Sequence, residues 1–344
     1  MQAVVKEAPG PGNVVLKDVP EPHAGPGQVR IAVRVSGICG SDLHIAQGDI
    51  KLRVRPPVVM GHEFAGVVDE VGAGVSGWRV GDRVTAETTV STCGRCRSCR
   101  DGAYNRCPER EILGYMHDGA FAAWVVVAAE RLHRVPDNVS LEEAAMTEPL
   151  ACCVRAMCDV AQVHPGDLVV VAGPGPIGLL CLQLAMAAGA RTVIVGAAGD
   201  EERLDVAKSL GADCALVEQG GLAERLIHEL SGGEGCDLFV EASGAARAAQ
   251  LGLASLRRGG QYLQVGLAGQ PFAIDLSLLA YKELKMLGSL SQVWPAWERA
   301  LLLLSRRQVN VRALQTHTFP LGQWEEAFRV FASKRGLKVM LRPE

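Results

Sequence analysis

The N-terminal part of the chain consists of short segments in which apolar and polar residues alternate. Gln28 to Val35, read as QVRIAVRV, alternates in the way a half-buried β-strand does. Similar runs at 61–75, 81–87 and 120–136 are interrupted by glycine and proline, which confine each run to the length of a strand. This pattern predicts a β-rich, barrel-like domain.

The middle of the chain has a different pattern, in which apolar strands alternate with longer helical stretches. The segment from Leu168 to Ala190 reads as a buried strand, a glycine-rich turn and an apolar helix, and a second strand follows from Arg191 to Gly196. Further strand-like segments lie at 236–244, 259–267 and 283–290. Such alternation is typical of a parallel, doubly wound sheet, so we expect an α/β domain here.

The composition narrows the class of protein. A chain of 344 residues with a formal net charge of −3 is long enough for two domains and gives no electrostatic case for binding nucleic acid. No apolar run is long enough to span a bilayer, and the start of the chain, MQAVVKEAPGPG, lacks the regions of a signal peptide. We therefore expect a cytoplasmic protein with neither a membrane nor a nucleic-acid partner.

Four of the eleven cysteines are clustered within 15 residues, in CGRCRSCRDGAYNRC. In a reducing compartment, clustered cysteines indicate a metal site more often than disulfides. Cys93, Cys96, Cys99 and Cys107 could supply four thiolates to a tetrahedral zinc ion. An iron–sulfur cluster is the alternative that this spacing allows, although the chain shows no second cluster of cysteines. We expect a structural zinc that holds a lobe at 90–110 together and performs no chemistry.

The turn after Leu168–Ala172 carries a dinucleotide-binding motif, GPGPIG. Gly173 permits the turn, Gly175 lets the backbone approach a pyrophosphate, and Gly178 allows the helix to pack closely on the strand. The helix N-terminus, with Pro176 and Ile177, attracts the phosphates. Val265 and Gly266, at the end of a later strand, are also expected at the cofactor.

The choice between NAD and NADP depends on the end of the second strand. An acidic residue usually receives the ribose hydroxyls of NAD there, but this chain reads GAAGDEERL, with Gly196 and Ala197 in the expected place. Arg203 could face the 2′-phosphate of NADP, whereas Asp200 could reach the ribose of NAD from further on. The carboxylates around Arg203 would repel a phosphate, so we favour NAD.

A second group of metal ligands is spread along the chain. Cys39 lies in SGICGSDLH, directly after a predicted strand, and His62 and Glu63 begin another. Together with a carboxylate they make a catalytic zinc site with three protein ligands and one open position. In a regular strand His62 and Glu63 would point to opposite faces, so either the backbone is irregular and Glu63 binds directly, or Glu148 does so, or the two exchange.

These motifs together resemble the zinc-containing medium-chain alcohol and polyol dehydrogenases over nearly the whole chain. The matching segments are GICGSDLH, GHEFAGVVDEVGAGV, GDRV, the four-cysteine lobe, EPLA, AGPGPIG and GLKVML. The resemblance implies a GroES-like catalytic domain at 1–152 and 290–344 and a Rossmann domain at 153–289. It implies catalytic zinc at Cys39, His62 and Glu63, with Glu148 at the same metal directly or through water. It also places Lys338 near the cofactor phosphates and suggests a homodimer or homotetramer.

The resemblance also implies a mechanism. Zinc lowers the pKa of a substrate hydroxyl, and Ser41 passes its proton through the cofactor ribose to His44 at the surface, while hydride moves to the nicotinamide. Asp42 is expected to brace the turn. The substrate is a small alcohol, or a ketone in the reverse reaction: the secondary alcohol of a polyol, a sugar derivative or an amino alcohol.

Sorbitol and L-threonine dehydrogenases are the nearest types within the family, since both have a glutamate after the histidine. Sorbitol enzymes carry an arginine–tyrosine pair where this chain has Ser289 and Leu290, and threonine enzymes carry a histidine where it has Arg155. An L-threonine 3-dehydrogenase-like or vicinal-diol activity is therefore the alternative. Two other classes remain to be tested: a non-catalytic nucleotide-binding relative, and a zinc-free quinone or enoyl reductase.

Overall fold

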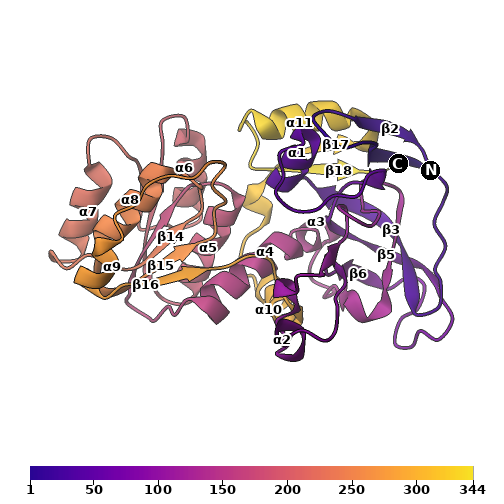
Figure 1. Cartoon of the computed structure of the whole chain (residues 1–344), viewed down its shortest axis with the longest axis horizontal. Helices are drawn as coiled ribbons and strands as arrows, with labels where there is room; N and C mark the ends of the chain where they lie inside the picture. Colours follow the sequence, from indigo (N-terminus) through magenta and orange to yellow (C-terminus); the bar gives the residue numbers. More distant parts are fainter. Residues whose placement is uncertain (344) are drawn as a thin grey trace. The chain divides into compact units, whose positions relative to one another are not determined.

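The computed structural model describes residues 1–343, which form two compact units (Figure 1). Unit 1 contains Met1–Pro149, Gln292–Ser305 and the residues from Leu314 onward, and unit 2 contains Leu150–Ser291 and Arg306–Ala313. The sequence analysis placed 306–313 in the first domain. They group instead with unit 2, where Gln183 donates to the Asn310 carbonyl at 3.4 Å and accepts from its N–H at 2.6 Å.

Unit 1 is built on a mainly antiparallel sheet, in which the described residues form seven strands. Their order is β10 (Leu132–Arg134), β6 (Arg83–Ala86), β5 (Glu63–Val71), β3 (Gln28–Gly37), β18 (Lys338–Arg342) and β17 (Gln315–Pro320), with β9 (Trp124–Ala128) paired to β3. The alternating pattern of the first segment is confirmed, because alternate residues of β3 from Val29 to Val35 are buried and Arg34 is exposed.

Smaller elements surround this sheet. They include β1 (Gln2–Lys6), β2 (Val14–Asp18) and β4 (Val58–Val59) in one sheet, and β7 (Thr89–Ser91) and β8 (Glu111–Ile112) in another. The helices are α1 (Gly40–Gln47), α2 (Arg97–Arg100), α3 (Leu141–Ala144), α10 (Trp294–Ser305) and α11 (Trp324–Ala332), and α4 (Thr147–Val154) begins in unit 1. The 3-10 turns are η1 (Tyr104–Arg106), η2 (Ala129–Arg131) and η5 (Leu321–Gln323), and η4 (Arg312–Leu314) begins in unit 2 and ends in unit 1.

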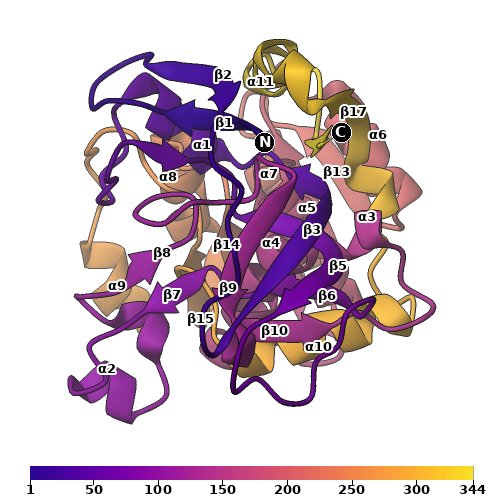
Figure 2. The ribbon, with the colours of Figure 1, turned by 90° about the vertical axis from the view of Figure 1, so that its right-hand side faces the viewer.

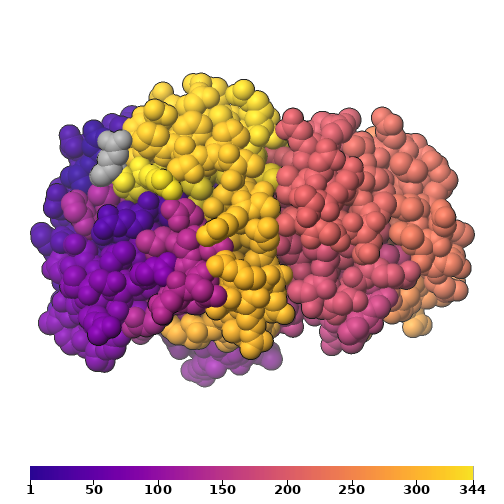
Figure 3. Space-filling view, turned by 180° about the vertical axis from the view of Figure 1, so that it is seen from behind, coloured from indigo at the N-terminus to yellow at the C-terminus, as the bar shows by residue number. Residues whose placement is uncertain are grey.

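The end of the chain returns to its beginning. Met340 and Leu341 of β18 pair with Gly37 and Ser36 of β3, so the C-terminal strand lies beside the segment that carries Cys39. In Figure 3, yellow residues from the C-terminal part of the chain share a face with indigo residues of the N-terminal part. In Figure 2 the segment with α2 extends away from β7 and β8.

Unit 2 contains a parallel sheet in the order β13-β12-β11-β14-β15-β16, which is the strand order of a Rossmann fold. The strands are β11 (Leu168–Ala172), β12 (Arg191–Gly196), β13 (Cys214–Val217), β14 (Cys236–Glu241), β15 (Leu256–Gln264) and β16 (Lys285–Gly288). The helices are α5 (Pro176–Ala187), α6 (Glu201–Ser209), α7 (Leu222–Leu230), α8 (Ala246–Ser255), α9 (Ser277–Lys282) and the π-helix η3 (Arg155–Val160). The predicted doubly wound sheet is therefore confirmed.

Among residues 1–343, no helix combines the length and the apolar character that a membrane crossing requires.

Candidate functional site

The turn between β3 and α1 presents Cys39. Cys39 is the N-cap residue of α1, and its backbone N–H donates to Asp42 Oδ2 at 2.8 Å. Asp42 is completely buried although it is charged, because this bond and the helix N-terminus stabilise its carboxylate. Asp42 braces the turn as expected and so fixes the direction of the Cys39 side chain.

His62 and Glu63 lie at the start of β5 and reach the same place as Cys39. The strand begins only at Glu63, so His62 belongs to the irregular segment before it, next to Gly61 with φ +90°. The irregular backbone considered from the sequence is present, and one ligand atom from each of Cys39, His62 and Glu63 lies within 4.8 Å of the others.

Asp42 also orients His62. Its Oδ1 lies 3.6 Å from His62 Nδ1, and Ser41 Oγ lies 3.5 Å from His62 Nε2. Burial alone would lower the pKa of His62, but Asp42, together with Tyr115 and Cys39, outweighs burial and raises the pKa well above its ordinary value. Asp42 thus favours positive charge at this ring, and its position beside Nδ1 leaves Nε2 for a metal ion, as a carboxylate–histidine pair does in zinc sites.

Lys338 lies in this cluster, and its position near the cofactor phosphates, which the resemblance implies, stays a prediction. Lys338 is 2% exposed, and its Nζ donates to Glu63 Oε2 at 2.6 Å and to the Ile38 carbonyl at 3.0 Å. Burial lowers the pKa of Lys338, but the charges of Glu63 and Cys39 raise it above the ordinary value overall. Gly37 makes room for the pair, because a Cβ there would lie 2.6 Å from Glu63 Oε2.

Glu148, at the start of α4, is held by a different partner. Gln292 is fully buried, and its Nε2 donates to Glu148 Oε1 at 3.2 Å and to Thr88 Oγ1 at 2.9 Å. Burial raises the pKa of Glu148, and the nearby charge of His62 counteracts this rise. Glu148 is therefore close to the cluster but is not one of the three residues whose ligand atoms converge.

Tyr115 is a member of the cluster to which the sequence analysis assigned no role. It is 5% exposed, and its ring packs edge-on against His62 with centroids 5.5 Å apart. Burial raises the pKa of Tyr115, so the phenol is protonated at neutral pH. No sequence motif links Tyr115 to Cys39 or His62, and only the fold brings them together.

The replacement of Asp42 by asparagine tests its support of the metal ligands. Asp42→Asn keeps the shape of the side chain but removes the charge beside His62, so we expect zinc affinity at this site to fall by about ten- to a hundredfold. Competition with a chromophoric chelator measures the affinity. Asp49→Asn, which removes an exposed carboxylate just beyond α1, should leave it unchanged. Equal affinities in the wild type and Asp42→Asn would contradict this role.

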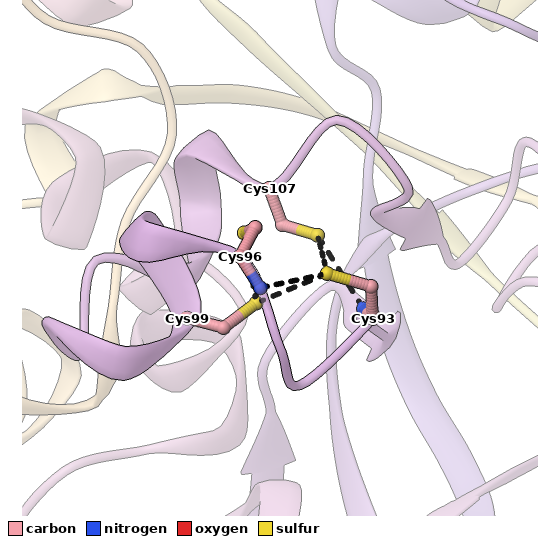
Figure 4. Close-up of side chains that lie close together, drawn as sticks. All are labelled: Cys93, Cys96, Cys99 and Cys107. Atoms are coloured by element: carbon pink, nitrogen blue, oxygen red, sulfur yellow. Dashed lines mark hydrogen bonds between the residues drawn. The ribbon is translucent and has the colours of Figure 1, made fainter.

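The four clustered cysteines converge in the segment around α2 (Figure 4). The sulfur–sulfur distances are 3.5 Å for Cys96–Cys99, 3.6 Å for Cys107–Cys93 and 3.9 Å for Cys93–Cys99. A tetrahedron with Zn–S bonds of about 2.3 Å has edges of about 3.8 Å, so the cluster has the size of a zinc site.

The backbone around this cluster supports a thiolate. The N–H groups of Arg95 and Cys96 lower the pKa of the Cys93 thiol to about 6, and Gly94 and Gly102 adopt positive φ values of 66° and 70°. Tyr104, within the same segment, donates from its hydroxyl to the buried Glu87 at 2.6 Å and accepts from the Trp294 N–H at 2.6 Å. The lobe is thereby anchored to the rest of unit 1.

The glycine motif of unit 2 has the geometry that the sequence predicted. Gly173 has φ +102°, Gly175 is the N-cap residue of α5, and Pro176 is the first residue of that helix, followed by Ile177. A Cβ on Gly178 would lie 1.9 Å from the Gly173 carbonyl, so only glycine fits there. The exposed N–H groups of the helix N-terminus face the end of β11, as in a phosphate-binding turn.

The other predicted cofactor residues follow the carboxyl ends of neighbouring strands. Ala197 follows β12, and Val265 and Gly266 follow β15. The backbone N–H groups of Val265 and Gly266 donate to the Glu241 carbonyl at 2.9 and 2.8 Å. Ligands of open α/β sheets bind at this edge. Asp200 Oδ2 accepts a hydrogen bond from the Ala197 N–H at 2.9 Å, so the Asp200 carboxylate lies at the end of β12.

The chain matches two protein families: the alcohol dehydrogenase GroES-like domain at residues 25–137 and zinc-binding dehydrogenase at residues 176–306. Sorbitol dehydrogenase of Halalkalibacterium halodurans is 44% identical over 344 residues, which cover 100% of this chain and 99% of that protein. D-arabitol-phosphate dehydrogenase of Enterococcus avium is 40% identical over 99% of this chain and 97% of its own. Among solved structures, alcohol dehydrogenase TADH from Thermus sp. ATN1 has a TM-score of 0.89, with 32% identity over both full chains.

Proposed function

The chain belongs to the zinc-binding alcohol dehydrogenase family, and from that premise we propose that it transfers a hydride between a nicotinamide dinucleotide and the secondary alcohol of a polyol, a sugar derivative or an amino alcohol. The observation that carries the proposal is the convergence of Cys39, His62 and Glu63 beside Ser41. A non-catalytic relative would have no need of this buried set.

The donor set fits zinc. Sulfur, imidazole nitrogen and carboxylate oxygen are the three ligand types that catalytic zinc sites use, with one position left for substrate. Glu63 supports this fit, because Oε2 is bound by Lys338 while the buried Oε1 has no hydrogen-bond partner. We therefore propose Glu63 as the third ligand and Glu148, held by Gln292, as a neighbouring carboxylate. The cysteine lobe would hold a second, structural zinc.

We assign the transfer of the substrate proton to residues of unit 1. A bound zinc would act as a Lewis acid that lowers the pKa of the substrate hydroxyl. Ser41 would accept the proton of that hydroxyl while it gives up its own proton, and His44 would release a proton to solvent. His44 is suited to this last step because its side chain is 53% exposed, and its Nδ1 lies 2.9 Å from Asp49 Oδ1.

We propose NAD as the cofactor in preference to NADP. A side chain at Gly196, where the family acid usually stands, would place its Cβ 2.9 Å from the Cβ of Asp200, so Asp200 has taken over that space. Burial lowers the pKa of Arg203, and the charge of Asp200 counteracts this effect. The carboxylate of Asp200 favours ribose hydroxyls over a 2′-phosphate at this place.

Asp200→Asn tests the choice of cofactor. Asparagine retains an acceptor for the Ala197 N–H but loses the charge, so we expect the KM for NAD to rise about tenfold and the preference over NADP to shrink. Initial rates with each cofactor at saturating substrate measure both. Glu202→Gln, which changes an exposed carboxylate on the same helix, serves as the control. An unchanged KM for NAD in Asp200→Asn would show that the ribose is recognised elsewhere.

The substrate is proposed to be a polyol or its phosphate. The side chain of Arg155, at the start of the π-helix η3, donates to Ser289 Oγ at 3.0 Å. A guanidinium is thus present at the position where sorbitol enzymes carry an arginine, although it comes from another part of the chain. Guanidinium groups bind hydroxyl clusters and phosphates, and one of the relatives acts on D-arabitol phosphate by its name.

The experiment that tests the function is a panel of initial rates with NAD and with NADP. Substrates are free polyols, polyol phosphates, vicinal diols and L-threonine, and zinc is measured in the same sample. Turnover of polyols or their phosphates with about two zinc ions per chain supports the proposal. Turnover of L-threonine alone would support the hydride transfer but contradict the polyol substrate, and a protein without zinc would overturn the proposed function.

We also propose a cytoplasmic homodimer or homotetramer. The thiolates of both proposed zinc sites need a reducing compartment. The terminal strand of the unit 2 sheet, β16, leaves a hydrogen-bonding edge, and Met286 on it and Tyr281 before it are 43% and 73% exposed. Such an edge with apolar side chains suits pairing with a second copy.

A further inference from the structure

We propose that Glu241 is a positioning residue for the nicotinamide half of the dinucleotide. Glu241 is completely buried at the end of β14 and connects two loops, residues 242–245 after β14 and residues 265–267 after β15. The inference rests on the proposed function, because it assigns a part in cofactor binding to a residue outside the glycine motif.

The first of these loops folds around the carboxylate of Glu241. Its Oε1 accepts from the Ser243 N–H at 2.8 Å and from the Ser243 hydroxyl at 2.5 Å. The Gly244 N–H is shared between both oxygens, at 3.0 Å from Oε1 and 2.9 Å from Oε2. The Ser243 hydroxyl in turn accepts from the Ala245 N–H at 3.1 Å. Because hydrogen bonds to a charged acceptor are strong, the carboxylate fixes the path of the loop that follows it.

The second loop is joined to the same carboxylate through Gln264. Gln264 Nε2 donates to Glu241 Oε2 and to the Gly266 carbonyl, both at 2.6 Å, and Gln264 Oε1 accepts from the Tyr262 hydroxyl at 2.6 Å. The main-chain carbonyl of Glu241 also accepts from the N–H groups of Val265 and Gly266. Glu241 therefore holds the second loop through its side chain and through its backbone.

The two loops also contact each other directly. A Cβ on Gly266 would lie 2.5 Å from the Gly244 nitrogen and 2.7 Å from Glu241 Oε2, and a Cβ on Gly244 would lie 2.3 Å from the Leu267 carbonyl oxygen. A buried charge is costly unless it is hydrogen-bonded, and its donors here come from Ser243, Gly244 and Gln264. The carboxylate is thus stabilised only while the two loops keep this one arrangement.

The strand order indicates which half of the cofactor these loops receive. In a sheet of this type the pyrophosphate lies at the glycine turn after β11, and the adenosine ribose lies beyond the next strand, β12. β14 and β15 lie on the other side of β11, so the loops that follow them are left for the nicotinamide half. Because Glu241 is itself buried, it acts on the cofactor through these loops.

Glu241→Gln tests the proposal by direct binding. The amide keeps the size of the side chain but replaces an acceptor oxygen with a donor, which then faces the donors of the two loops. We expect the Kd for NAD to rise about tenfold and the Kd for AMP, which contains only the adenosine half, to stay within about twofold of the wild-type value. Titration calorimetry with NAD and with AMP measures both constants without turnover.

Asp237→Asn is the matched control, because Asp237 is a partly buried carboxylate near the opposite end of β14. Its Oδ2 accepts from the Leu168 N–H at 2.7 Å and its Oδ1 from the Arg257 guanidinium at 2.6 Å. Asp237→Asn should lower the unfolding temperature, as Glu241→Gln does, and should leave both Kd values unchanged. The pair therefore separates positioning of the cofactor from a loss of stability.

Gln264→Met is a second, milder variant in case Glu241→Gln does not fold. It removes the side-chain link between Glu241 and the Gly266 carbonyl and leaves the bonds to Ser243 and Gly244 in place. We expect its Kd for NAD to rise about threefold, again without a change for AMP.

Equal rises in the Kd for NAD and for AMP would overturn the proposal, since they would show a general loss of structure at this edge of the sheet. An unchanged Kd for NAD in both Glu241→Gln and Gln264→Met would overturn it as well. A wild type that binds NAD, shows the expected differences between the variants and yet turns over no alcohol would contradict the proposed function alone.

Discussion

Cys39→Ala is expected to lower kcat/KM by at least about a thousandfold, because it removes one of three ligands from a metal that supplies several kcal/mol of transition-state stabilisation. Cys39 is not one of the four clustered cysteines, which form a separate group of potential metal ligands. The variant should therefore lose about one zinc ion per chain and keep the other. Elemental analysis together with initial rates measures both effects.

The control for this prediction is Cys214→Ser, which changes a half-buried cysteine of unit 2. It should retain both zinc ions and the wild-type rate. Full activity in Cys39→Ala would show that the cluster of Cys39, His62 and Glu63 is not the catalytic centre. Loss of both zinc ions would show that the two sites are not independent.

Lys338→Met is expected to destabilise the protein by about 3–5 kcal/mol when the catalytic site holds no zinc. Lys338 and Glu63 are 2% and 1% exposed, and removal of the ammonium leaves a buried carboxylate without its partner. Saturation with zinc should recover part of the loss, since a cation bound at Glu63 replaces the missing charge. Denaturant unfolding at defined zinc content measures the free energy of unfolding.

This prediction also separates the two roles considered for Lys338. A lysine at the cofactor phosphates would raise the KM for NAD strongly when replaced, whereas the observed ion pair predicts a nearly unchanged KM. Lys17→Met, which breaks the exposed pair with Glu7, should cost less than about 1 kcal/mol and is the matched control. A large rise in KM with little change in stability would restore the cofactor role.

Local sequence patterns were sufficient where chemistry and backbone lie in one short segment. The spacing of Cys93, Cys96, Cys99 and Cys107 predicted a four-sulfur cluster, and the structure brings these sulfurs within 4.8 Å of one another. The glycine motif at 173–178 predicted a tight turn and a helix start, and both are present. In each case the residues that must meet are close in the chain, so local geometry alone brings them together.

Local patterns were insufficient where the partner is distant in the sequence. Lys338 is 275 residues away from Glu63, and its position in the chain suggested a cofactor contact. The choice between Glu63 and Glu148 also stayed open, because it depends on distant partners: Gln292 binds Glu148, and Lys338 binds Glu63. Tyr115 packs against His62 although the two residues lie in separate segments of the sequence, so no local pattern indicated this contact.

The sequence by itself determined the two types of domain, the family and the identity of both candidate zinc sites, because apolar periodicity and ligand spacing are properties of short segments. Only the tertiary structure decided which carboxylate lies with Cys39 and His62, which lysine binds it and which tyrosine packs against His62. Those choices arise when β18 pairs with β3 and when the loop after β8 packs on Gly61. Burial then makes each charge and each hydroxyl depend on the one neighbour that the fold provides.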